Sequence, residues 1–217
     1  EMKQVVILTA CISFLMGIAL LVYSLQGASY EIWLNFSGLG VASILAAIAY
    51  TVGKRPYGYM GLGDVSVFLF FGLIGTVGTY YLQTYSLNLA IFLPASGCGF
   101  LSVAVLNLNN LRDIENDRKT GKNSIPVRIG KIYGFYYQKT IMLLGVCTFI
   151  IYLMYQGKPI QLSQNIIIMA GWYPLVQIIK QLNSKMTPAQ IDPYLKKTAL
   201  STLFLIVIFG VSQIFLS

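Results

Sequence analysis

Apolar residues occur along the chain in seven long runs that are separated by short polar connections. A helix needs about 20 residues to cross the hydrocarbon core of a bilayer, and each run reaches or approaches that length once its flanks are included. The runs cover residues 5–25, 32–52, 65–82, 87–106, 137–155, 166–179 and 198–216. The pattern therefore predicts an all-α, polytopic bundle of seven transmembrane helices.

The composition agrees with a chain that lies in a lipid bilayer. Hydrophobic residues make up 56% of the sequence and charged residues only 10%, whereas a soluble domain has about 25% charged residues. This balance disfavours a water-soluble fold. The spans of a helical membrane bundle pack together as one unit, so chain length does not set a number of separate domains. We therefore interpret residues 1–217 as a single transmembrane domain.

Basic residues predict how the chain is oriented. The 15 Lys and Arg residues exceed the 7 Asp and Glu residues, an excess that in a soluble protein would suggest nucleic acid. In a membrane protein the distribution decides: if the N-terminus faces the cytoplasm, every basic residue except Lys158 falls on the cytoplasmic side. We therefore expect no nucleic-acid partner, a location in the bacterial inner membrane, and function on the cytoplasmic face.

The strongest chemical signal is the segment NNLRDIENDRKTGK at residues 109–122, directly after the fourth run. On a helix that continues through it, Asn110, Asp113 and Asp117 would share one face while Glu115 points away. Two carboxylates one turn apart repel each other unless a cation lies between them, and hard oxygen ligands suit Mg²⁺. The segment predicts a Mg²⁺ site formed by Asp113, Asp117 and Asn110.

Basic side chains in the same segment would neutralise an anionic substrate such as a diphosphate. The candidates are Arg112, Arg118 and Lys122. On spacing alone, a solvated helix end whose charges pair with one another explains the segment equally well. Its place at the membrane surface favours a functional site, because three of the seven acidic residues lie within residues 113–117.

A second polar cluster lies at the cytoplasmic end of the second run. Tyr50 and Lys54 are four residues apart and share a helix face, Arg55 follows, and Asp64 opens the third run. Tyr and Lys at a helix end are also typical of an aromatic belt and of snorkelling, so the cluster alone favours a structural role. The chain has no histidine, so its chemistry must use carboxylates, Lys, Arg, Tyr and Asn.

Together the two clusters resemble the UbiA-type intramembrane prenyltransferase superfamily. The superfamily pattern has a Tyr-x-x-x-Lys at one helix end and an Asp-x-x-x-Asp after a later helix, which Tyr50, Lys54, Asp113 and Asp117 match. The strings KRPYGYMGLGD, NNLRDIENDRKTGK and SIPVRIG are similar to its 1,4-dihydroxy-2-naphthoate polyprenyltransferase branch, which acts in menaquinone synthesis.

The resemblance implies a Mg²⁺-dependent enzyme that transfers a polyprenyl group from its diphosphate to an aromatic acceptor. It implies that Mg²⁺ and cationic side chains stabilise the departing diphosphate while the electron-rich ring attacks the allylic cation. Asp113 and Asp117, with Asn110, would bind the metal, and Tyr50 and Asp64 would orient or deprotonate the acceptor. The implied diphosphate partners are Lys54, Arg55, Arg112, Arg118 and Lys122.

The sequence also departs from that family. Such enzymes have nine spans and an earlier Asn/Asp-rich motif for another Mg²⁺, and neither the first two helices nor that motif is found here. We therefore expect the chain to correspond to the last seven helices and to be inactive or impaired by itself. The alternatives are a prenyltransferase for another aromatic acceptor and a small membrane transporter, which would place polar groups deep inside its spans.

Overall fold

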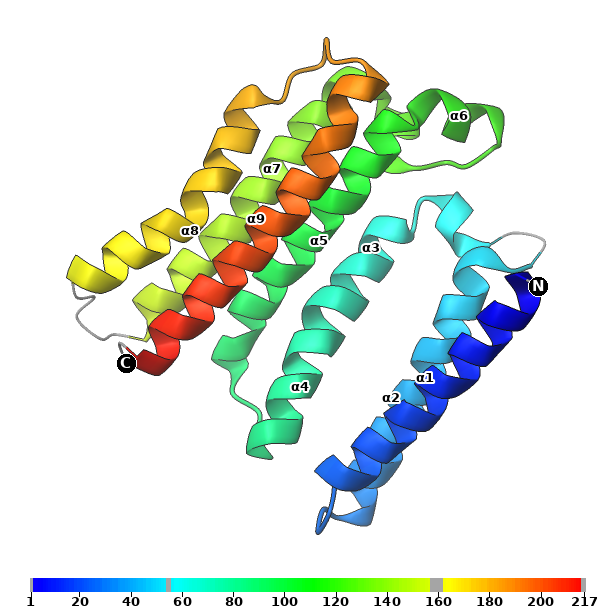
Figure 1. Ribbon diagram of the computed structural model, residues 1–217, viewed down its shortest axis with the longest axis vertical. Helices are drawn as coiled ribbons and strands as arrows, with labels where there is room; N and C mark the ends of the chain where they lie inside the picture. Colours follow the sequence, from blue (N-terminus) through cyan, green and yellow to red (C-terminus); the bar gives the residue numbers. More distant parts are fainter. Residues whose placement is uncertain (1, 54–55, 157–161, 216–217) are drawn as a thin grey trace.

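The computed structural model describes residues 2–53, 56–156 and 162–215, and within these ranges every regular element is a helix. Figure 1 shows the long helices lying side by side. They are α1 (Met2–Ser24), α2 (Tyr30–Thr51), α4 (Gly75–Thr84), α5 (Phe92–Arg112), α7 (Ile125–Tyr155), α8 (Leu162–Gln181) and α9 (Pro188–Phe215). The shorter elements are η1 (Tyr57–Met60), α3 (Gly63–Val67), the π-helical η2 (Phe68–Ile74), η3 (Leu89–Ile91) and α6 (Ile114–Lys119).

The predicted fold class, a polytopic helical bundle of the membrane, is confirmed. Among the described residues, five helices are long and apolar enough to cross a bilayer. They are Tyr30–Thr51, Gly63–Thr84 (α3, η2 and α4 end to end), Leu89–Arg112, Ile125–Tyr155 and Pro188–Ile214. Helices α1 and α8 overlap the first and sixth predicted runs, and Cys11–Ser24 within α1 is a shorter apolar helix. The count of seven spans therefore stays a prediction.

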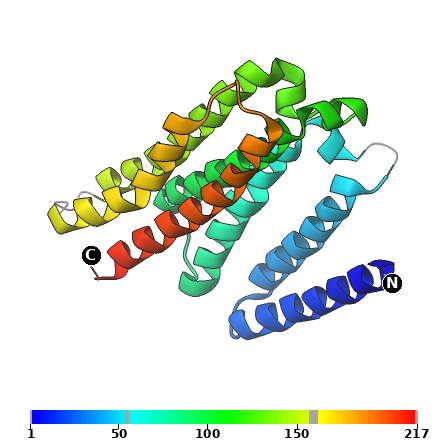
Figure 2. The same ribbon diagram turned by 45° about the horizontal axis from the view of Figure 1, so that its top comes forward.

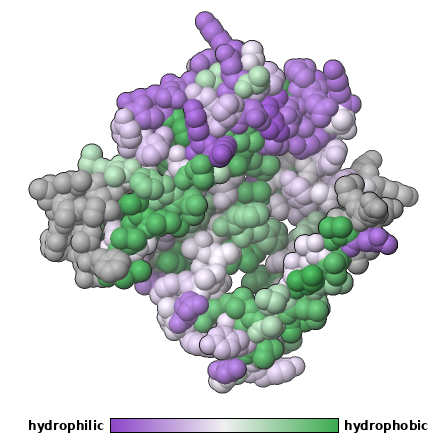
Figure 3. Space-filling view, viewed as in Figure 1, coloured by the Kyte–Doolittle hydropathy of each residue, from purple (hydrophilic) through white to green (hydrophobic). Residues whose placement is uncertain are grey.

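Hydrophilic residues gather at one end of the molecule. In Figure 3 they cover the upper end, whereas apolar residues cover much of the surface below it. Helix α6 and the connection between α8 and α9 lie at this same end in Figure 1. We call it the polar end, and it holds the loops in which the sequence concentrates its charges.

Helix α5 lies at the centre of the bundle, where it packs against α7, α9 and η2. Its buried apolar residues recur at helical spacing, at Leu101, Ala104, Leu108 and Leu111, so one continuous stripe faces the core. Opposite this stripe lie buried residues of α7, α8 and α9, which include Met142, Phe149, Leu175 and Leu205. This central helix carries its C-terminal end, and with it the candidate metal segment, to the polar end.

Glycine allows η2 and α5 to approach closely. A β-carbon on Gly72 would lie 2.6 Å from the Cα of Gly99 and 2.9 Å from the carbonyl oxygen of Ala95, which no real side chain tolerates. A β-carbon on Gly99 would in turn lie 2.7 Å from the Phe68 ring. The contact fixes the distance between the Gly63–Thr84 rod, which carries Asp64, and the helix that ends at Arg112.

Helices α1 and α2 form an antiparallel pair on the other side of the α3–α4 rod from α5, as Figures 1 and 2 show. Helix α2 has no buried residue, and large apolar side chains along both helices are exposed, as expected for surfaces that face lipid. The pair contacts the rod through a stack of Phe36 on Tyr81, with ring centroids 5.6 Å apart. The Tyr85 hydroxyl also donates a hydrogen bond to the carbonyl oxygen of Ser24.

Candidate active site at the polar end

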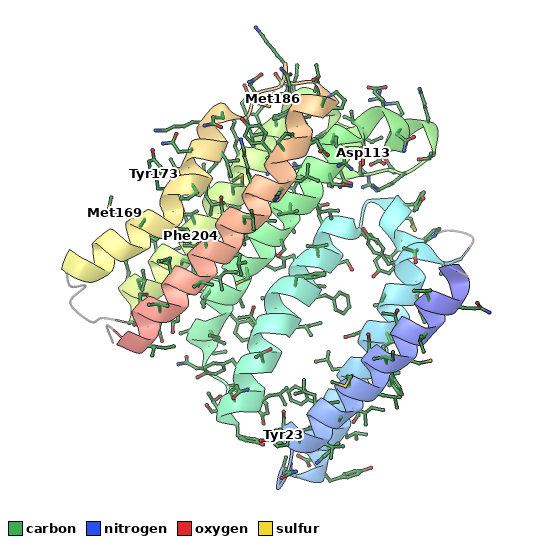
Figure 4. All side chains as sticks on the ribbon, in the orientation of Figure 1. Tyr23, Asp113, Met169, Tyr173, Met186 and Phe204 are labelled. Atoms are coloured by element: carbon green, nitrogen blue, oxygen red, sulfur yellow. The ribbon has the colours of Figure 1, made fainter. Side chains whose placement is uncertain are left out.

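The polar end brings together residues from five separate segments of the chain. Tyr50 lies in the last turn of α2, Asp64 in the first turn of α3, Asn110 in the last turn of α5 and Asp117 in α6, and Lys122 follows α6. Figure 4 shows the stick of Asp113 at the junction of α5 and α6 on this end. The two polar clusters found in the sequence, more than 40 residues apart, are therefore parts of one site.

Lys122 is the centre of this site. Its ammonium group donates hydrogen bonds to Asn110 Oδ1 and to Asp117 Oδ2, both at 2.9 Å. The Ser124 hydroxyl donates a further one to Asp117 Oδ2 at 3.2 Å. Asp117 is only 4% exposed and Asn110 only 3%, so these oxygen atoms are turned inward and already surround a cation.

The expectation of one continuous helix through residues 109–122 is wrong. Helix α5 ends at Arg112, and Asp113 has φ −97° and ψ 11°, outside the helical region, before α6 begins at Ile114. The side chain of Asp113 is turned to Arg112, whose guanidinium donates two hydrogen bonds of 2.8 Å to its two oxygen atoms. Asp113 therefore does not share the inward face of Asn110 and Asp117.

Arg112 joins three elements at this junction. Beyond Asp113, it donates a hydrogen bond of 2.6 Å to Asp192 Oδ1 at the start of α9 and one of 2.8 Å to Asn109 Oδ1. The guanidinium holds the pKa of Asp113 below its usual value, because the bidentate hydrogen bond favours the charged carboxylate. Asp113 is thus an anion already paired with a basic side chain.

One of the predicted diphosphate partners, Arg118, lies outside this cluster. Arg118 is exposed and pairs with Glu115, whose carboxylate lies 3.2 Å from Nη1. Glu115 itself points away from the site, as the helical spacing predicts. In the structure Arg118 therefore belongs to an exposed surface ion pair. This pairing is what a solvated helix end, the alternative explanation of this segment, predicts.

Lys54 and Arg55 lie outside the described residues. Their predicted contacts with a diphosphate stay predictions.

Tyr50 and Asp64 lie beside the Lys122 cluster. Both Asp64 and Asp117 are close enough to the Tyr50 phenol to act on it electrostatically, and the charge of Lys122 reaches Asp64. Asp64 is 9% exposed, and its Oδ2 accepts a hydrogen bond of 2.7 Å from the hydroxyl of Tyr137 on α7. The predicted acceptor residues Tyr50 and Asp64 therefore lie near Asp117 and Lys122.

The segment that leads to Asp64 is tied to the loop that carries Lys122. The amide of Asn123 donates to the carbonyl oxygen of Tyr59 at 2.8 Å, and Arg128 donates to the carbonyl oxygen of Met60. Gly61 has a φ of +78°, and a β-carbon there would lie 2.5 Å from the Arg128 guanidinium. Glycine is needed at this position because it permits both the left-handed turn and the close approach of Arg128.

An apolar cavity of about 430 Å³ adjoins the polar cluster, and Tyr50 contributes to both. It lies between α2 and the rod of α3 and η2, and its lining is mostly aromatic and aliphatic. The lining residues are Ser43, Ala47, Tyr50, Tyr57, Ser66, Val67, Phe70 and Phe71. Tyr57 packs edge-on against Tyr50, with centroids 5.3 Å apart, and its hydroxyl lies 3.0 Å from the Ser66 hydroxyl.

The donor set at the cluster fits a divalent cation in part. The Lys122 ammonium occupies a position between two inward-facing oxygen atoms, so Asn110 and Asp117 form a ready site for positive charge. Asp113 would have to leave Arg112 to join them. Across the described residues, no group of three or more His, Cys, Asp and Glu side chains is arranged to hold a metal ion. Such a site would therefore depend on substrate oxygens and water, as Mg²⁺ sites commonly do.

Three residues of the site were missed in the sequence. Ser124 begins the string SIPVRIG but no chemistry is assigned to it from the sequence, and Tyr137 and Asp192, the latter near the start of α9, belong to no motif with a chemical meaning. A weak signal existed for Asp192, since acidic residues are scarce in this chain. For Tyr137, one of 15 tyrosines, no signal existed.

Comparison with known proteins gives a consistent result. The chain matches the UbiA prenyltransferase family over residues 2–191. It is 54% identical over 140 residues to a protein of Haemophilus influenzae named 1,4-dihydroxy-2-naphthoate octaprenyltransferase, a match that covers 63% of this chain and 44% of that protein. It is 37% identical over 223 residues to the Escherichia coli protein of the same name, covering 100% of this chain and 68% of that one.

A more distant relative is named for a different activity. The chain is 30% identical over 104 residues to the 2-carboxy-1,4-naphthoquinone phytyltransferase of Synechocystis, a match that covers 47% of this chain and 33% of that protein. No solved structure matches the chain.

Proposed function

The chain belongs to the UbiA prenyltransferase family, and from this premise we propose that it transfers a polyprenyl group from its diphosphate to 1,4-dihydroxy-2-naphthoate. In this reaction the bond between the allylic carbon and the diphosphate oxygen breaks, a carbon–carbon bond to the ring forms, and carbon dioxide is lost. The product is demethylmenaquinol, a precursor of menaquinone. The relatives named for the naphthoate acceptor support this choice over other aromatic acceptors.

One observation carries the proposal: an inward-facing cluster of Asn110, Asp117 and Lys122 lies beside an apolar cavity, with Tyr50 between them. A polyprenyl diphosphate has a highly charged head and a long apolar chain, so it needs these two environments side by side. A transporter would require polar groups along its spans. In this chain the charged groups of the described site lie at helix ends, which favours the enzyme.

The cationic residues of the site would bind the diphosphate. Lys122 is the first candidate, because its ammonium group points into the cluster and has three donors to share. Arg112 lies at the same end, and its planar guanidinium suits phosphate oxygens, although it is paired with Asp113 and Asp192 in the structure. Lys54 and Arg55 remain further candidates from the sequence.

Asp117 and Asn110, joined by Asp113, would hold Mg²⁺. When bound, the ion supplies positive charge that stabilises the departing diphosphate. Asp117 is buried, and its burial would limit the water that reaches the reacting carbon.

Asp64 and Tyr50 would bind the acceptor. Both lie beside the polar cluster, Asp64 as a buried carboxylate and Tyr50 as a phenol that also lines the cavity. Asp64 would accept a hydrogen bond from a ring hydroxyl. This would increase the electron density at the ring carbon that attacks. Tyr50 would hold the flat ring against the allylic end of the donor.

We place this reaction in the bacterial inner membrane, with the polar end facing the cytoplasm. The chain is an integral membrane protein by its family and its apolar helices. The excess of basic residues in the loops of the polar end supports the cytoplasmic orientation.

The test is prenyl transfer in membranes that contain the full-length gene product, with polyprenyl diphosphate and dihydroxynaphthoate supplied. We expect product formation that requires Mg²⁺ and falls at least a hundredfold in Asp117→Ala. Glu115→Ala is the matched control, because this carboxylate lies in the same short helix but is exposed. Undiminished transfer by Asp117→Ala, or transfer that persists in excess chelator, would rule out the proposed metal site.

A further inference from the structure

Tyr137 is a partly buried tyrosine to which the proposed reaction assigns no role. It lies on α7, and its ring packs against the hydrophobic core. Its hydroxyl leaves the core and donates a hydrogen bond of 2.7 Å to Asp64 Oδ2, across 73 residues of sequence. Among the described residues, no hydrogen bond reaches the other carboxylate oxygen, Oδ1.

The turn of α7 that carries Tyr137 is fixed in place. Its neighbour Gln138 is fully buried and accepts a hydrogen bond of 2.8 Å from the side-chain amide of Asn107 on α5. The same amide donates to the carbonyl oxygen of Gly134 at 3.3 Å. A β-carbon on Gly134 would lie 2.8 Å from Leu111, so α5 and α7 are also in close contact here. Tyr137 therefore extends from a rigid junction of two central helices.

A rigid donor changes what a buried carboxylate can do. A carboxylate without a fixed hydrogen bond rotates between orientations, and each orientation presents its oxygen atoms differently. The strong hydrogen bond between the phenol and Oδ2 selects one orientation, because bonds to a charged acceptor are short and strong. The remaining oxygen of Asp64 is then held in one orientation, within electrostatic range of the Tyr50 phenol.

We propose that Tyr137 is a positioning residue, which holds Asp64 so that its free oxygen accepts a hydrogen bond from a hydroxyl of a hydroxylated aromatic acceptor. The inference rests on the proposed function, because it assigns Asp64 to the acceptor and not to the diphosphate. It adds a residue from α7, an element from which no residue was assigned to the site by the sequence. Tyr137 touches neither substrate and acts through Asp64 alone.

The experiment compares Tyr137→Phe with Tyr136→Phe in full-length enzyme in membranes. Phenylalanine keeps the ring that packs in the core and removes only the hydroxyl. Tyr136 is the matched control, since it is the adjacent residue on α7 and is 65% exposed. Initial rates are measured while the aromatic acceptor and the polyprenyl diphosphate are varied separately, and the amount of folded protein is measured by thermal unfolding in detergent.

We expect Tyr137→Phe to lower kcat/KM for the acceptor by about tenfold to a hundredfold, the range for a hydrogen bond to a charged group. The KM for the polyprenyl diphosphate should stay unchanged, and Tyr136→Phe should behave as wild type. Because the two residues act as a unit, Tyr137→Phe should cost much less in an Asp64→Asn background than in wild type.

Three results would overturn the inference while wild-type transfer remains intact. They are wild-type acceptor kinetics in Tyr137→Phe, equal losses for both substrates, and additive effects with Asp64→Asn. Absence of transfer to dihydroxynaphthoate by the wild-type enzyme would instead refute the proposed function, so the two failures are distinguishable.

Discussion

Replacing Lys122 with alanine tests the centre of the site most directly. The substitution removes the ammonium group that bonds Asn110 Oδ1 and Asp117 Oδ2, both at 2.9 Å. The Asp117 carboxylate, only 4% exposed, then keeps the Ser124 hydroxyl at 3.2 Å as its side-chain partner. A buried charge that has lost its counterion is unfavourable, so the free energy of unfolding should fall.

The size of the effect follows from burial. Removing one partner of a fully buried ion pair costs about 3–5 kcal/mol. The Lys122 side chain keeps 21% exposure, which admits solvent, and the Ser124 hydroxyl remains. We therefore expect a loss of about 2–3 kcal/mol, which for a chain of this size lowers Tm by about 5–10 °C. The control Lys119→Ala, at an exposed position of α6, should change stability by less than about 0.5 kcal/mol.

The assay is thermal unfolding of the purified protein in detergent, once with chelator and once with Mg²⁺. On the proposed metal site, the ion would have to displace the ammonium group in the wild type, whereas in Lys122→Ala the oxygen atoms would be open to it. A concentration about 100 times the Kd would stabilise the variant by about 2.7 kcal/mol, enough to offset most of its loss. Stability in chelator equal to that of Lys119→Ala would refute the ion-pair argument. Equal Mg²⁺ shifts in wild type and Lys122→Ala would refute the view that the ammonium lies in the place of a metal.

Three further predictions concern the frame of the site. Gly72→Ala should lower the free energy of unfolding by about 1–3 kcal/mol, because its β-carbon would meet the backbone of Gly99. The control Gly78→Ala, whose nearest contact lies at 4.0 Å, should be neutral. Equal unfolding temperatures for the two variants would contradict this prediction. Ser124→Ala should lower the free energy of unfolding by about 1 kcal/mol, less than Lys122→Ala, and a larger loss in the same unfolding assay would show that the hydroxyl has another role. Arg112→Ala should bring the pKa of Asp113 back up towards its usual value of 3.8. A lowered pKa of Asp113 stabilises the wild type above pH 3.8, and this stabilisation is lost as the pH falls through the folded pKa. The difference in free energy of unfolding between wild type and Arg112→Ala should therefore be full at neutral pH and vanish in acid. A difference that stays constant across this pH range would contradict the assignment.

The helical fold could be predicted from the sequence because its signal is local. Runs such as 32–52 and 87–106 are predominantly apolar. The structure has α2 in the first and the helical segment Leu89–Arg112 in the second. The glycine at position 72 shows what the runs do not contain. Its contact with Gly99 depends on which faces of two helices meet, and no periodicity within either helix specifies that pairing.

The site could be predicted only where a motif lies on one element. Asn110, Asp117 and Lys122 were found from one short segment, and the structure brings them together. Asp113 was placed wrongly, because helical spacing assumes a continuous helix and Arg112 instead draws the carboxylate to its own side. Tyr137 was missed because its role arises from a contact with Asp64 that only the packing of α7 creates.

The position of the site at the helix ends has an energetic reason. Charged side chains are costly in hydrocarbon, so a cluster such as Asp117 and Lys122 must lie where water reaches the bundle. An isoprenoid chain has the opposite preference and is stabilised among side chains such as those of Phe70 and Phe71. A substrate that contains both groups can bind only across the boundary between these environments. On the proposed function, the bond that breaks would then lie at that boundary, beside Tyr50, which contributes to both sides. On the same proposal the acceptor ring would lie beside Asp64, so that Tyr50 would align donor and acceptor.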